Sequence, residues 1–517
     1  MAAETIEELT ARYGESYRLL LTTAGMIAAF TMVLNGTIVN VAVPDVMGAF
    51  GVGQDQAQLL ATAYVATMTA SQLLNAWFVQ TFGQRLAFIL MLVVFTAGGV
   101  ICAVAPSLDL IIFGRVMQGF ASGVVQPLVM VTLFQLFPKE RRGVAMGIYG
   151  MALVLALGVG PVIGGITVDT LGWRAIFYVN TPLLVIAFIM GMVFMPSARP
   201  AGDRTPFDWT SYALLCLALY CLISGISSGQ REGWTSNMIM LRLVIGLCAA
   251  ALFALLQLRA GPRMLDFSLF SNPRFASAVV IAFVFGMGNF AMTYAVPVFG
   301  QIVQGYTATV SGFLLLPASL LLLVVFPLTG RLADKVPPQF PIMGGLLLFA
   351  IGVYFMSGAD VNTVFWATAW FTIVARVGMA FINPPLMACA LAALPGERLH
   401  QGSGTINFFR QLGGAMGTNL LVVVLELRTQ FHSESLVATQ TAANTVTREL
   451  LEHVVALLGS EGIPQAMQQS VALNHLSRMV YAQAHTFGFQ DGFLMIAILF
   501  LAALLPAWIL GKSRVKN

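Results

Sequence analysis

Long apolar stretches alternate with short polar ones along almost the whole chain. A bilayer core of roughly 30 Å requires about 20 apolar residues in a helix, and stretches of this length recur throughout the sequence. Each of them predicts a membrane-spanning helix. The predicted spans are 18–43, 57–79, 86–105, 110–136, 143–168, 174–195, 209–229, 237–258, 275–300, 309–330, 340–358, 363–393, 402–427 and 488–510. The expected fold class is therefore an all-α polytopic membrane protein with fourteen transmembrane helices.

One long polar segment interrupts this pattern, between residues 428 and 487. Its parts 437–458 and 463–484 have helical periodicity and few helix breakers, which predicts a small helical cap. The alternative is a docking surface for a periplasmic partner, and the sequence leaves both interpretations open.

Composition and charge agree with a membrane location. The chain is 58% hydrophobic and 9% charged, whereas a soluble domain carries roughly 25% charged residues. Most of the 26 Lys and Arg lie on the side of the two chain ends, and only Arg174, Arg231 and Arg242 lie in short loops or helix ends opposite. Because basic loops stay in the cytoplasm, both termini are expected to be cytoplasmic. The acidic N-terminal tail lacks the basic start of a signal peptide and is expected to remain.

Nothing in the sequence predicts an enzyme. The five cysteines all fall within predicted spans and lack metal-ligand spacing, and no nucleophile elbow or phosphate loop is found. The net charge of +4 follows from the loop bias and gives no support for a nucleic-acid partner. We expect no cofactor and no metal.

An internal repeat is expected to relate the two halves of the chain, the alternative being chance similarity among apolar helices. Residues 110–147 and 371–404 each place an arginine early in an apolar helix, Arg115 or Arg376, followed by prolines and then a polar turn. The turns pair Pro138, Glu140 and Arg141 with Pro395, Glu397 and Arg398 at one constant offset. Secondary transporters are commonly built from such repeats, with the substrate site at the repeat interface near the bilayer midplane.

Six motifs resemble the major facilitator superfamily, and more closely its fourteen-helix drug:proton antiporters of the EmrB/QacA type. They are LNGTIVNVAVP at 34–44, GRVMQG at 114–119, GVGPVIGG at 158–165, GWRAIFYVNTP at 172–182, GRLADK at 330–335 and NFFRQLGGAMG at 407–417. The resemblance covers nearly the whole chain. It implies an antibiotic or multidrug efflux transporter of a bacterial inner membrane that works by alternating access. EmrB-like exporters can work with a periplasmic adaptor and an outer-membrane channel, and these partners are left open.

The resemblance also implies a domain organisation, with two six-helix bundles and two extra helices between them. The expected parts are a cytoplasmic tail at 1–17, an N-terminal bundle at 18–196, two extra helices at 197–262, a C-terminal bundle at 263–511 that includes the loop 428–487, and a tail at 512–517.

Several motif residues acquire expected roles through this resemblance. Arg115 and Gln118, one helical turn apart, would take part in proton transfer, although Arg115 could instead brace backbone carbonyls or extend to the interface.

The glycine-rich antiporter motif favours export, and small residues also allow close helix packing. Its residues are Gly158, Gly160, Pro161, Gly164 and Gly165. The gating loop comprises Gly330, Arg331, Asp334 and Lys335, whereas the equivalent loop of the first half has Gln80 in place of an acid, so that half is expected to be weak or rebuilt.

The largest departure from the family lies in the first span. Asn35 occupies the position of the usual acid, and an Asn side chain cannot carry a proton. None of the 22 carboxylates falls at the middle of a span. We expect one of three acids at periplasmic span ends, Asp45, Glu426 or Asp491, to replace the missing acid together with Arg115. The alternative for each is an ordinary solvated charge at a helix end.

The absence of a deep acid also affects the expected substrate. The polar side chains expected in the cavity are Asn35, Thr37, Asn40, Tyr64, Gln72, Gln126, Asn289, Tyr294, Asn383, Asn407, Arg410 and Gln411. With Arg115, Arg376 and Arg410 inside spans, neutral or anionic amphiphiles are favoured over quaternary cations, because a cation site normally offers a negative group.

The leading functional hypothesis is a secondary active exporter of hydrophobic or amphipathic small molecules, driven by exchange for protons. A facilitator or differently coupled carrier is one rival. The other is a non-transporting receptor or scaffold that binds through the loop 428–487, and deletion of that loop would separate the two classes.

Overall fold

The computed structural model describes residues 4–197, 206–259, 264–441 and 443–512 as helices joined by short connections. The α-helices are α1 (Ile6–Tyr13), α2 (Ser16–Ile38), α3 (Val43–Phe50), α4 (Gln54–Ser71), α5 (Asn75–Val104), α6 (Leu108–Leu136), α7 (Arg142–Leu171), α8 (Thr181–Phe194), α9 (Trp209–Glu232), α10 (Asn237–Leu258), α11 (Pro273–Ile302), α12 (Ala308–Phe313), α13 (Leu316–Lys335), α14 (Gln339–Met356), α15 (Phe365–Ala392), α16 (Leu399–Thr439), α17 (Thr445–Ser460), α18 (Gln465–Ala502) and α19 (Leu504–Lys512). Short 3₁₀ helices are η1 (Val39–Ala42), η2 (Gln72–Leu74), η3 (Lys139–Arg141), η4 (Trp173–Phe177), η5 (Phe267–Ser271) and η6 (Gly396–Arg398). Parts of the predicted segments 197–262 and 512–517 lie outside the described residues.

The described part of the chain contains 13 helical stretches long and apolar enough to cross a membrane. One of them, Leu59–Val104, has 46 residues, about twice the length that one crossing needs. The helix breaks at Gly83, which has a φ of 79°. Before this break α4 runs parallel to α6, since Tyr64 lies against Gly119 and Met68 against Gly123.

After Gly83 the direction reverses. Gln84 bonds to Gln135 near the end of α6, and Gly98 lies against Gly114 near its beginning, so this part of α5 is antiparallel to α6. The 46-residue stretch therefore crosses twice, and the predicted all-α fold with two bundles and two extra helices is confirmed.

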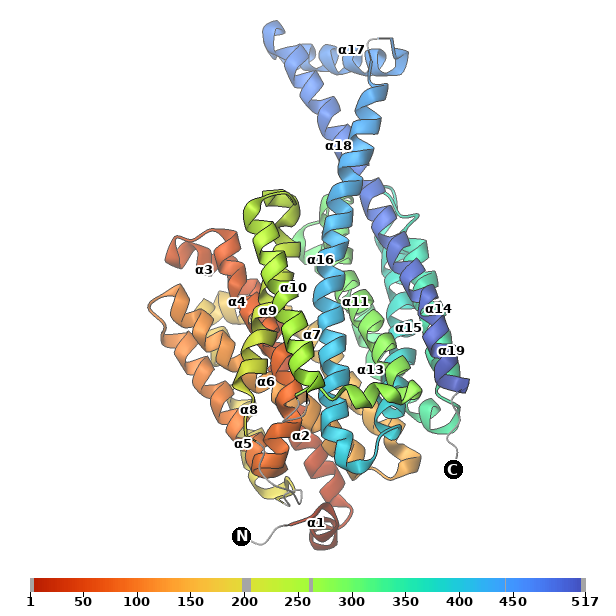
Figure 1. Ribbon diagram of the computed structural model, residues 1–517. Coiled ribbons are helices and arrows are strands. Elements are labelled where there is room, and N and C mark those ends of the chain that lie inside the picture. The colour runs from red at the N-terminus through yellow and green to blue at the C-terminus, as the bar shows by residue number, and fades with distance from the viewer. Residues whose placement is uncertain (1–3, 198–205, 260–263, 442, 513–517) are drawn as a thin grey trace.

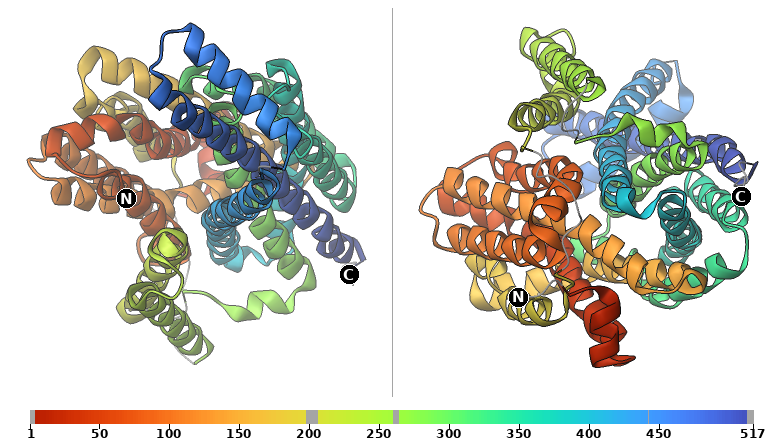
Figure 2. Two further views of the ribbon diagram at one scale, coloured as in Figure 1. Left: turned by 90° about the horizontal axis from the view of Figure 1, so that it is seen from above. Right: turned by 60° about the horizontal axis from the view of Figure 1, so that its bottom comes forward.

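The helices form two bundles side by side (Figure 1). Helices α2 to α8 form the N-terminal bundle, and α11 to α16 with α18 and α19 form the C-terminal bundle. The pair α9 and α10 lies at the edge of the molecule in both views of Figure 2 and packs against α4 and α16. One contact of this pair is the hydrogen bond between Ser71 and Tyr212, at 2.9 Å.

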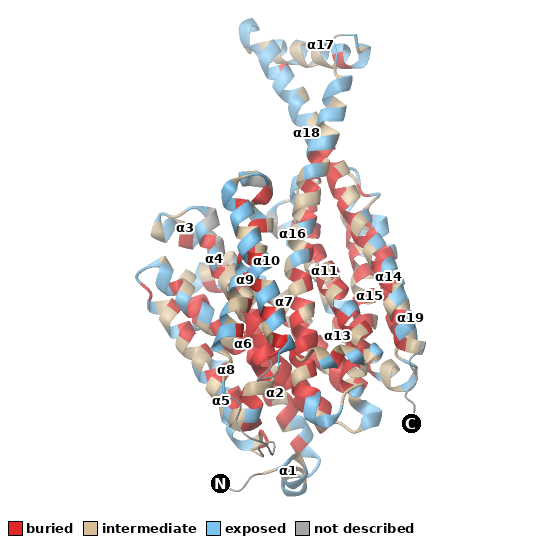
Figure 3. Ribbon diagram, in the orientation of Figure 1, coloured by how far each residue is buried: buried red, intermediate tan, exposed pale blue. Residues whose placement is uncertain are grey.

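Both chain ends lie at the same end of the molecule, which we call the terminal face (Figure 1). At the opposite end, the far face, α16 and α18 continue past the bundles and meet α17 in a projecting hairpin. The 41 residues of α16 correspond to about 60 Å of helix. Buried residues concentrate inside the bundles, whereas the hairpin is mostly exposed (Figure 3).

The hairpin corrects the prediction for residues 428–487 in detail. The segment is helical, as predicted, but no helix covers 437–458, because α16 continues to Thr439 and a new helix begins at Thr445. The break occurs where the Asn444 side chain accepts hydrogen bonds from Val446 and Thr447. Such an N-cap starts a helix. Asp491 joins the base of the hairpin by contacts of 2.6 Å to Arg428 and 2.7 Å to His432.

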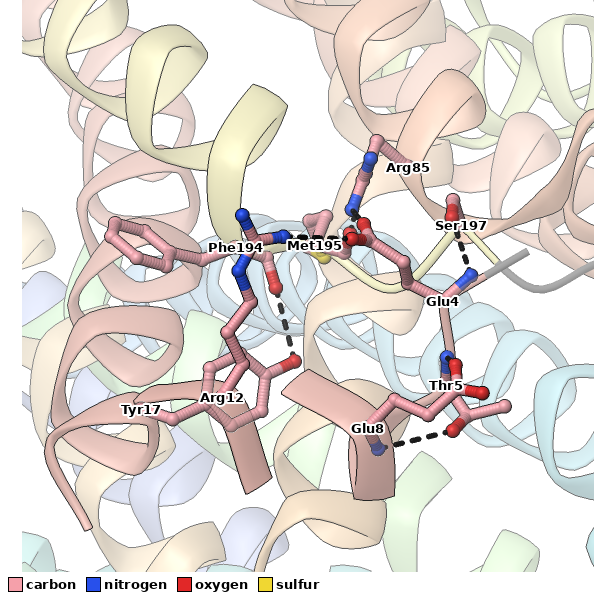
Figure 4. Close-up of polar contacts among 9 residues, drawn as sticks. All are labelled: Glu4, Thr5, Glu8, Arg12, Tyr17, Arg85, Phe194, Met195 and Ser197. Atoms are coloured by element: carbon pink, nitrogen blue, oxygen red, sulfur yellow. Dashed lines mark hydrogen bonds and ion pairs between the residues drawn. The ribbon is translucent and has the colours of Figure 1, made fainter. Parts of the chain in front are cut away.

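At the terminal face, polar contacts tie the first described residues to the N-terminal bundle (Figure 4). The Glu4 carboxylate contacts Arg85 at 2.7 Å and Arg12 at 3.3 Å. Glu4 and Ser197 exchange two further hydrogen bonds through the Glu4 backbone. The hydrogen bond from Arg85 lowers the pKa of Glu4 from its usual 4.5.

These contacts predict how acid affects α1. A carboxyl with a lowered pKa stabilises the folded arrangement fully above about pH 4.5, and this stabilisation is lost as the pH falls through the lowered pKa. Hydrogen exchange of α1 in nanodiscs, corrected for the intrinsic rate, should therefore stay slow from pH 7 to 5 and become faster in more acid solution. Glu4→Gln should exchange fast throughout, and the exposed Glu7→Gln serves as the control. Equal exchange in Glu4→Gln and wild type at pH 7 would contradict the role of this contact.

Candidate functional site

A cavity lies between the two bundles, with about 630 Å³ of empty space that includes its part open to solvent. Both bundles contribute to it, through α2, α6 and α7 on one side and α11, α13, α15 and α16 on the other. Its lining residues are Val33, Gln126, Gly150, Leu153, Val154, Leu157, Phe285, Asn289, Phe290, Leu322, Phe326, Arg376, Met379, Asn383, Arg410 and Gln411.

Five of the predicted cavity residues line this space: Gln126, Asn289, Asn383, Arg410 and Gln411. Arg376 also lines it and was not among the residues expected there. Its Nη1 donates to Asn289 Oδ1 at 3.0 Å, and its Nη2 donates to Thr293 Oγ1 at 2.7 Å. The internal repeat already paired Arg376 with Arg115, and that signal could have added it to the candidate set.

Arg115 lies in a separate buried cluster of the N-terminal bundle, with a side-chain exposure of 0%. Its guanidinium donates to the Asn35 carboxamide oxygen, to Gln118 Oε1 at 3.0 Å and to the Leu60 carbonyl at 3.1 Å. It also lies 4.2 Å from the centre of the Tyr64 ring. The structure thus brings together Arg115, Gln118, Asn35 and Tyr64, but it places Asn35 and Tyr64 beside this arginine and not on the cavity wall.

None of the three expected acids joins this cluster. Asp45 lies in the first turn of α3 and is exposed, and Asp491 pairs with Arg428 and His432 at the base of the hairpin. Glu426 lies on α16, close enough to Tyr294 to interact electrostatically. Within the described residues, the contacts of Arg115 include neutral groups only.

The other expected cavity residues whose side chains the structure describes do not line this cavity. Gln72 and Asn407 are fully buried, and Asn407 donates to the Ser403 carbonyl at 2.9 Å. Tyr294 is 39% exposed, and Thr37 donates to the Leu34 carbonyl at 3.0 Å. The Asn40 side chain lies outside the described part of the structure.

The glycine motif of α7 allows neighbouring helices to come close. A Cβ atom on Gly160 would overlap Thr37, and one on Gly164 would lie 3.0 Å from the Ile38 carbonyl. A Cβ on Gly158 would lie 3.2 Å from Ser319 of α13, across the bundle interface, whereas Gly165 has no such neighbour within 4 Å. Pro161 lies within this part of α7. The motif therefore lets α2 and α7 pack closely, and Gly158 adds a close contact with α13 of the C-terminal bundle.

The bundles also meet close to the terminal face. The Asp334 carboxylate accepts from the backbone N–H groups of Gly143 at 2.6 Å and Val144 at 3.1 Å. These groups belong to the first turn of α7, where the helix dipole favours a negative charge. Beside them, a Cβ atom on Gly330 would lie 2.6 Å from the Gly143 carbonyl oxygen. Of the four residues expected to form the gating loop, Gly330 and Asp334 make this contact, whereas Arg331 and Lys335 are exposed.

The equivalent contact of the first half uses neutral groups. Asn75 Nδ2 donates to the His400 carbonyl at 3.1 Å and to Ser403 Oγ at 3.3 Å. Gln84 Nε2 lies 3.1 Å from His400 Nε2, and Ser403 donates to the Pro127 carbonyl at 3.3 Å. The contact between this part of the N-terminal bundle and the start of α16 thus uses amide, hydroxyl and imidazole groups, in place of the acid that the family pattern has.

Comparisons with known proteins agree with this architecture. The chain is 29% identical to the MFS-type transporter YhcA of Bacillus subtilis (strain 168), over 95% of this chain and 92% of the relative. It is 26% identical to the multidrug export protein EmrB of Escherichia coli (strain K12), over 95% and 94%. The structure of the human organic anion transporter MFSD10 matches with a TM-score of 0.60 at 12% identity, over 95% of this chain and 99% of that one.

The relatives named as multidrug exporters confirm the resemblance that the motifs predicted. The family described as the Major Facilitator Superfamily matches residues 25–418, which is more than half of the chain. The fold and this match indicate a membrane transporter and not an enzyme. The chain belongs to the major facilitator superfamily.

Proposed function

We propose that this transporter exports hydrophobic or amphipathic small molecules from the cytoplasm by alternating access, in exchange for protons. The observation that carries the proposal is a cavity shared by two bundles that meet again near the terminal face. The terminal face is the cytoplasmic side in this proposal, because the basic loop residues gather there. The name of the relative EmrB, a multidrug export protein, supports both the direction and the substrate class.

The arrangement suits alternating access for a physical reason. The polar contacts between the bundles near the terminal face include Asp334 with the start of α7 and Asn75 with the start of α16. Hydrogen bonds of this kind can break and re-form when the bundles rotate relative to each other.

A differently coupled carrier is the second candidate, and one observation favours it. Arg115 contacts Asn35, Gln118 and Tyr64, and the part of the chain that the structure describes brings no carboxylate to this cluster. Protonation of a carboxylate beside a cation is a simple way to bias two conformations in opposite senses. The described contacts of Arg115 include no carboxylate that could act as this switch.

The substitution Asn35→Asp tests both candidates. Inverted membrane vesicles carrying wild type or Asn35→Asp would be given a fluorescent amphipathic dye and an acid-inside pH gradient at several external pH values. Proton exchange predicts that wild-type uptake responds to the gradient. The differently coupled carrier predicts a weak response in wild type and a several-fold stronger one in Asn35→Asp, because the new carboxylate would lie beside Arg115.

The control is Asn419→Asp, which places an acid on α16, where Asn419 bonds only locally to Ala415. It should behave as wild type. If neither wild type nor Asn35→Asp moves the dye under any gradient, the exporter proposal is wrong. If both respond equally, the second candidate is wrong.

A further inference from the structure

The cavity carries two positive charges and no negative one. Its described lining contains Arg376 of α15 and Arg410 of α16, and it contains no Asp or Glu. Among the described residues, none of the ion pairs includes either arginine. Two cations at a site with limited water are unfavourable unless a negative group offsets them.

The partners of both arginines are neutral. Arg376 uses two N–H groups on Asn289 and Thr293 of α11, which leaves the other donors of a five-donor guanidinium for a ligand. Arg410 is 7% exposed and lies beside the Tyr149 hydroxyl of α7. Neutral oxygens fix the direction of a guanidinium without neutralising it.

The internal repeat provides a comparison within the same molecule. In the first half, Arg115 of α6 contacts Asn35 of α2. In the second half, Arg376 of α15 contacts Asn289 of α11, the corresponding pair of helices. The first copy is covered completely, with 0% exposure of Arg115, whereas the second copy opens into the cavity. The same Arg–Asn arrangement is thus fully buried in one half and open to a ligand in the other.

Much of the remaining lining is apolar. Helix α7 of the N-terminal bundle presents Leu153, Val154 and Leu157, and α13 adds Leu322 and Phe326. A ligand that fills the cavity would therefore have its charged group on the C-terminal bundle and its apolar body against α7 and α13. Guanidinium groups hold oxyanions such as carboxylate and sulfonate by paired hydrogen bonds.

We propose that this cavity binds amphipathic organic anions, with the anionic group held by Arg376 and Arg410 and the apolar body packed against α7. This assignment rests on the proposed export function and specifies its substrate class. It also makes Asn289 a positioning residue, since its amide oxygen orients Arg376.

The test compares three fluorescent probes that share one naphthyl-alkyl body and end in a carboxylate, a primary amide or a trimethylammonium group. Binding to the purified full-length protein is measured by anisotropy at pH 7.5. Wild type should bind the carboxylate about tenfold more tightly than the amide, as expected for charge-assisted hydrogen bonds, and should bind the ammonium probe least. This ranking needs no mutant and overturns the proposal if the ammonium probe binds best.

Variants then locate the site. Arg376→Gln should lower carboxylate affinity about tenfold and leave amide affinity unchanged, while Arg376→Lys should keep part of the preference. Asn289→Asp should reduce or reverse the preference, because its carboxylate would neutralise Arg376 internally. Arg242→Gln is the control, since Arg242 lies on α10 and contacts Glu232 at 3.6 Å. Equal carboxylate affinity in wild type and Arg376→Gln would overturn the proposal.

Vesicle uptake of the same probes separates this inference from the proposed function. If none of the probes is transported, the exporter proposal fails. If the ammonium probe alone is transported, export stands and the anion assignment is wrong. Chloride at 0.5 M, roughly three times physiological ionic strength, should weaken carboxylate binding only moderately. Complete displacement would indicate a site for small inorganic anions and overturn the amphipathic class.

Discussion

Gly330→Val should prevent closure of the terminal face and abolish most transport. A Cβ atom at this position would lie 2.6 Å from the Gly143 carbonyl oxygen and 3.1 Å from Val144 Cα, both in the backbone of the opposite bundle. Overpacking of this kind costs about 1–3 kcal/mol. Since the clash exists only while the bundles touch, about 2 kcal/mol would shift the equilibrium between the two conformations by roughly 30-fold.

The measurement uses a cysteine at the closed face. Ser403 of α16 is 0% exposed and contacts Pro127 of the N-terminal bundle. Ser403→Cys, in a background without the native cysteines, should therefore react slowly with a maleimide. Gly330→Val should raise this rate at least about tenfold and lower dye efflux in parallel.

The matched control is Gly344→Val on α14, where a Cβ atom would meet nothing within 4 Å. It makes the same change of side chain within a helix without the clash. If Gly344→Val labels as fast as Gly330→Val, the effect is general loosening and the interbundle contact is not the cause.

The fold could be predicted from sequence because span length is a local property. An apolar stretch of about 20 residues must cross a bilayer whatever its neighbours are. The hairpin was less predictable, since the continuation of α16 to Thr439 depends on its packing against α18, and the break at Asn444 depends on a single cap. Both are details that hydrophobic periodicity does not encode.

The site was predictable in its residue types and less so in its geometry. A span shows that Arg115 and Arg376 lie in the membrane, but the direction in which each side chain points depends on the rotation of its helix within the bundle. Arg115 faces inward to Asn35 and Arg376 faces the cavity. The sequence alone shows Gln80 in place of the first-half gating acid. The group formed by Asn75, Gln84 and His400 could be found only from the structure, because it depends on the packing of α16 against α5.

A membrane potential alone should drive uptake of the carboxylate probe into inverted vesicles. If the cargo is an anion, its own charge supplies the energetic coupling that Asn35 cannot provide. One elementary charge crossing 100 mV is worth about 2.3 kcal/mol, which corresponds to roughly a 50-fold concentration ratio for a monovalent anion. With valinomycin and external potassium making the interior positive at equal pH, the carboxylate probe should approach this ratio, whereas the amide probe should not accumulate.

The pH gradient decides between this mechanism and proton exchange. Exchange of an inward proton for an outward anion also moves net charge, so a response to the potential is common to both mechanisms. Only proton exchange adds a response to a pH gradient at zero potential. The described contacts of Arg115 contain no group that titrates as a carboxylate does. A carrier driven by the anion's own charge therefore predicts that wild type responds to the potential and hardly to the pH gradient, and that Asn35→Asp responds to both, whereas the proposed proton exchange predicts that wild type responds to both. Accumulation driven by the pH gradient alone in wild type would instead require a coupling acid elsewhere in the chain.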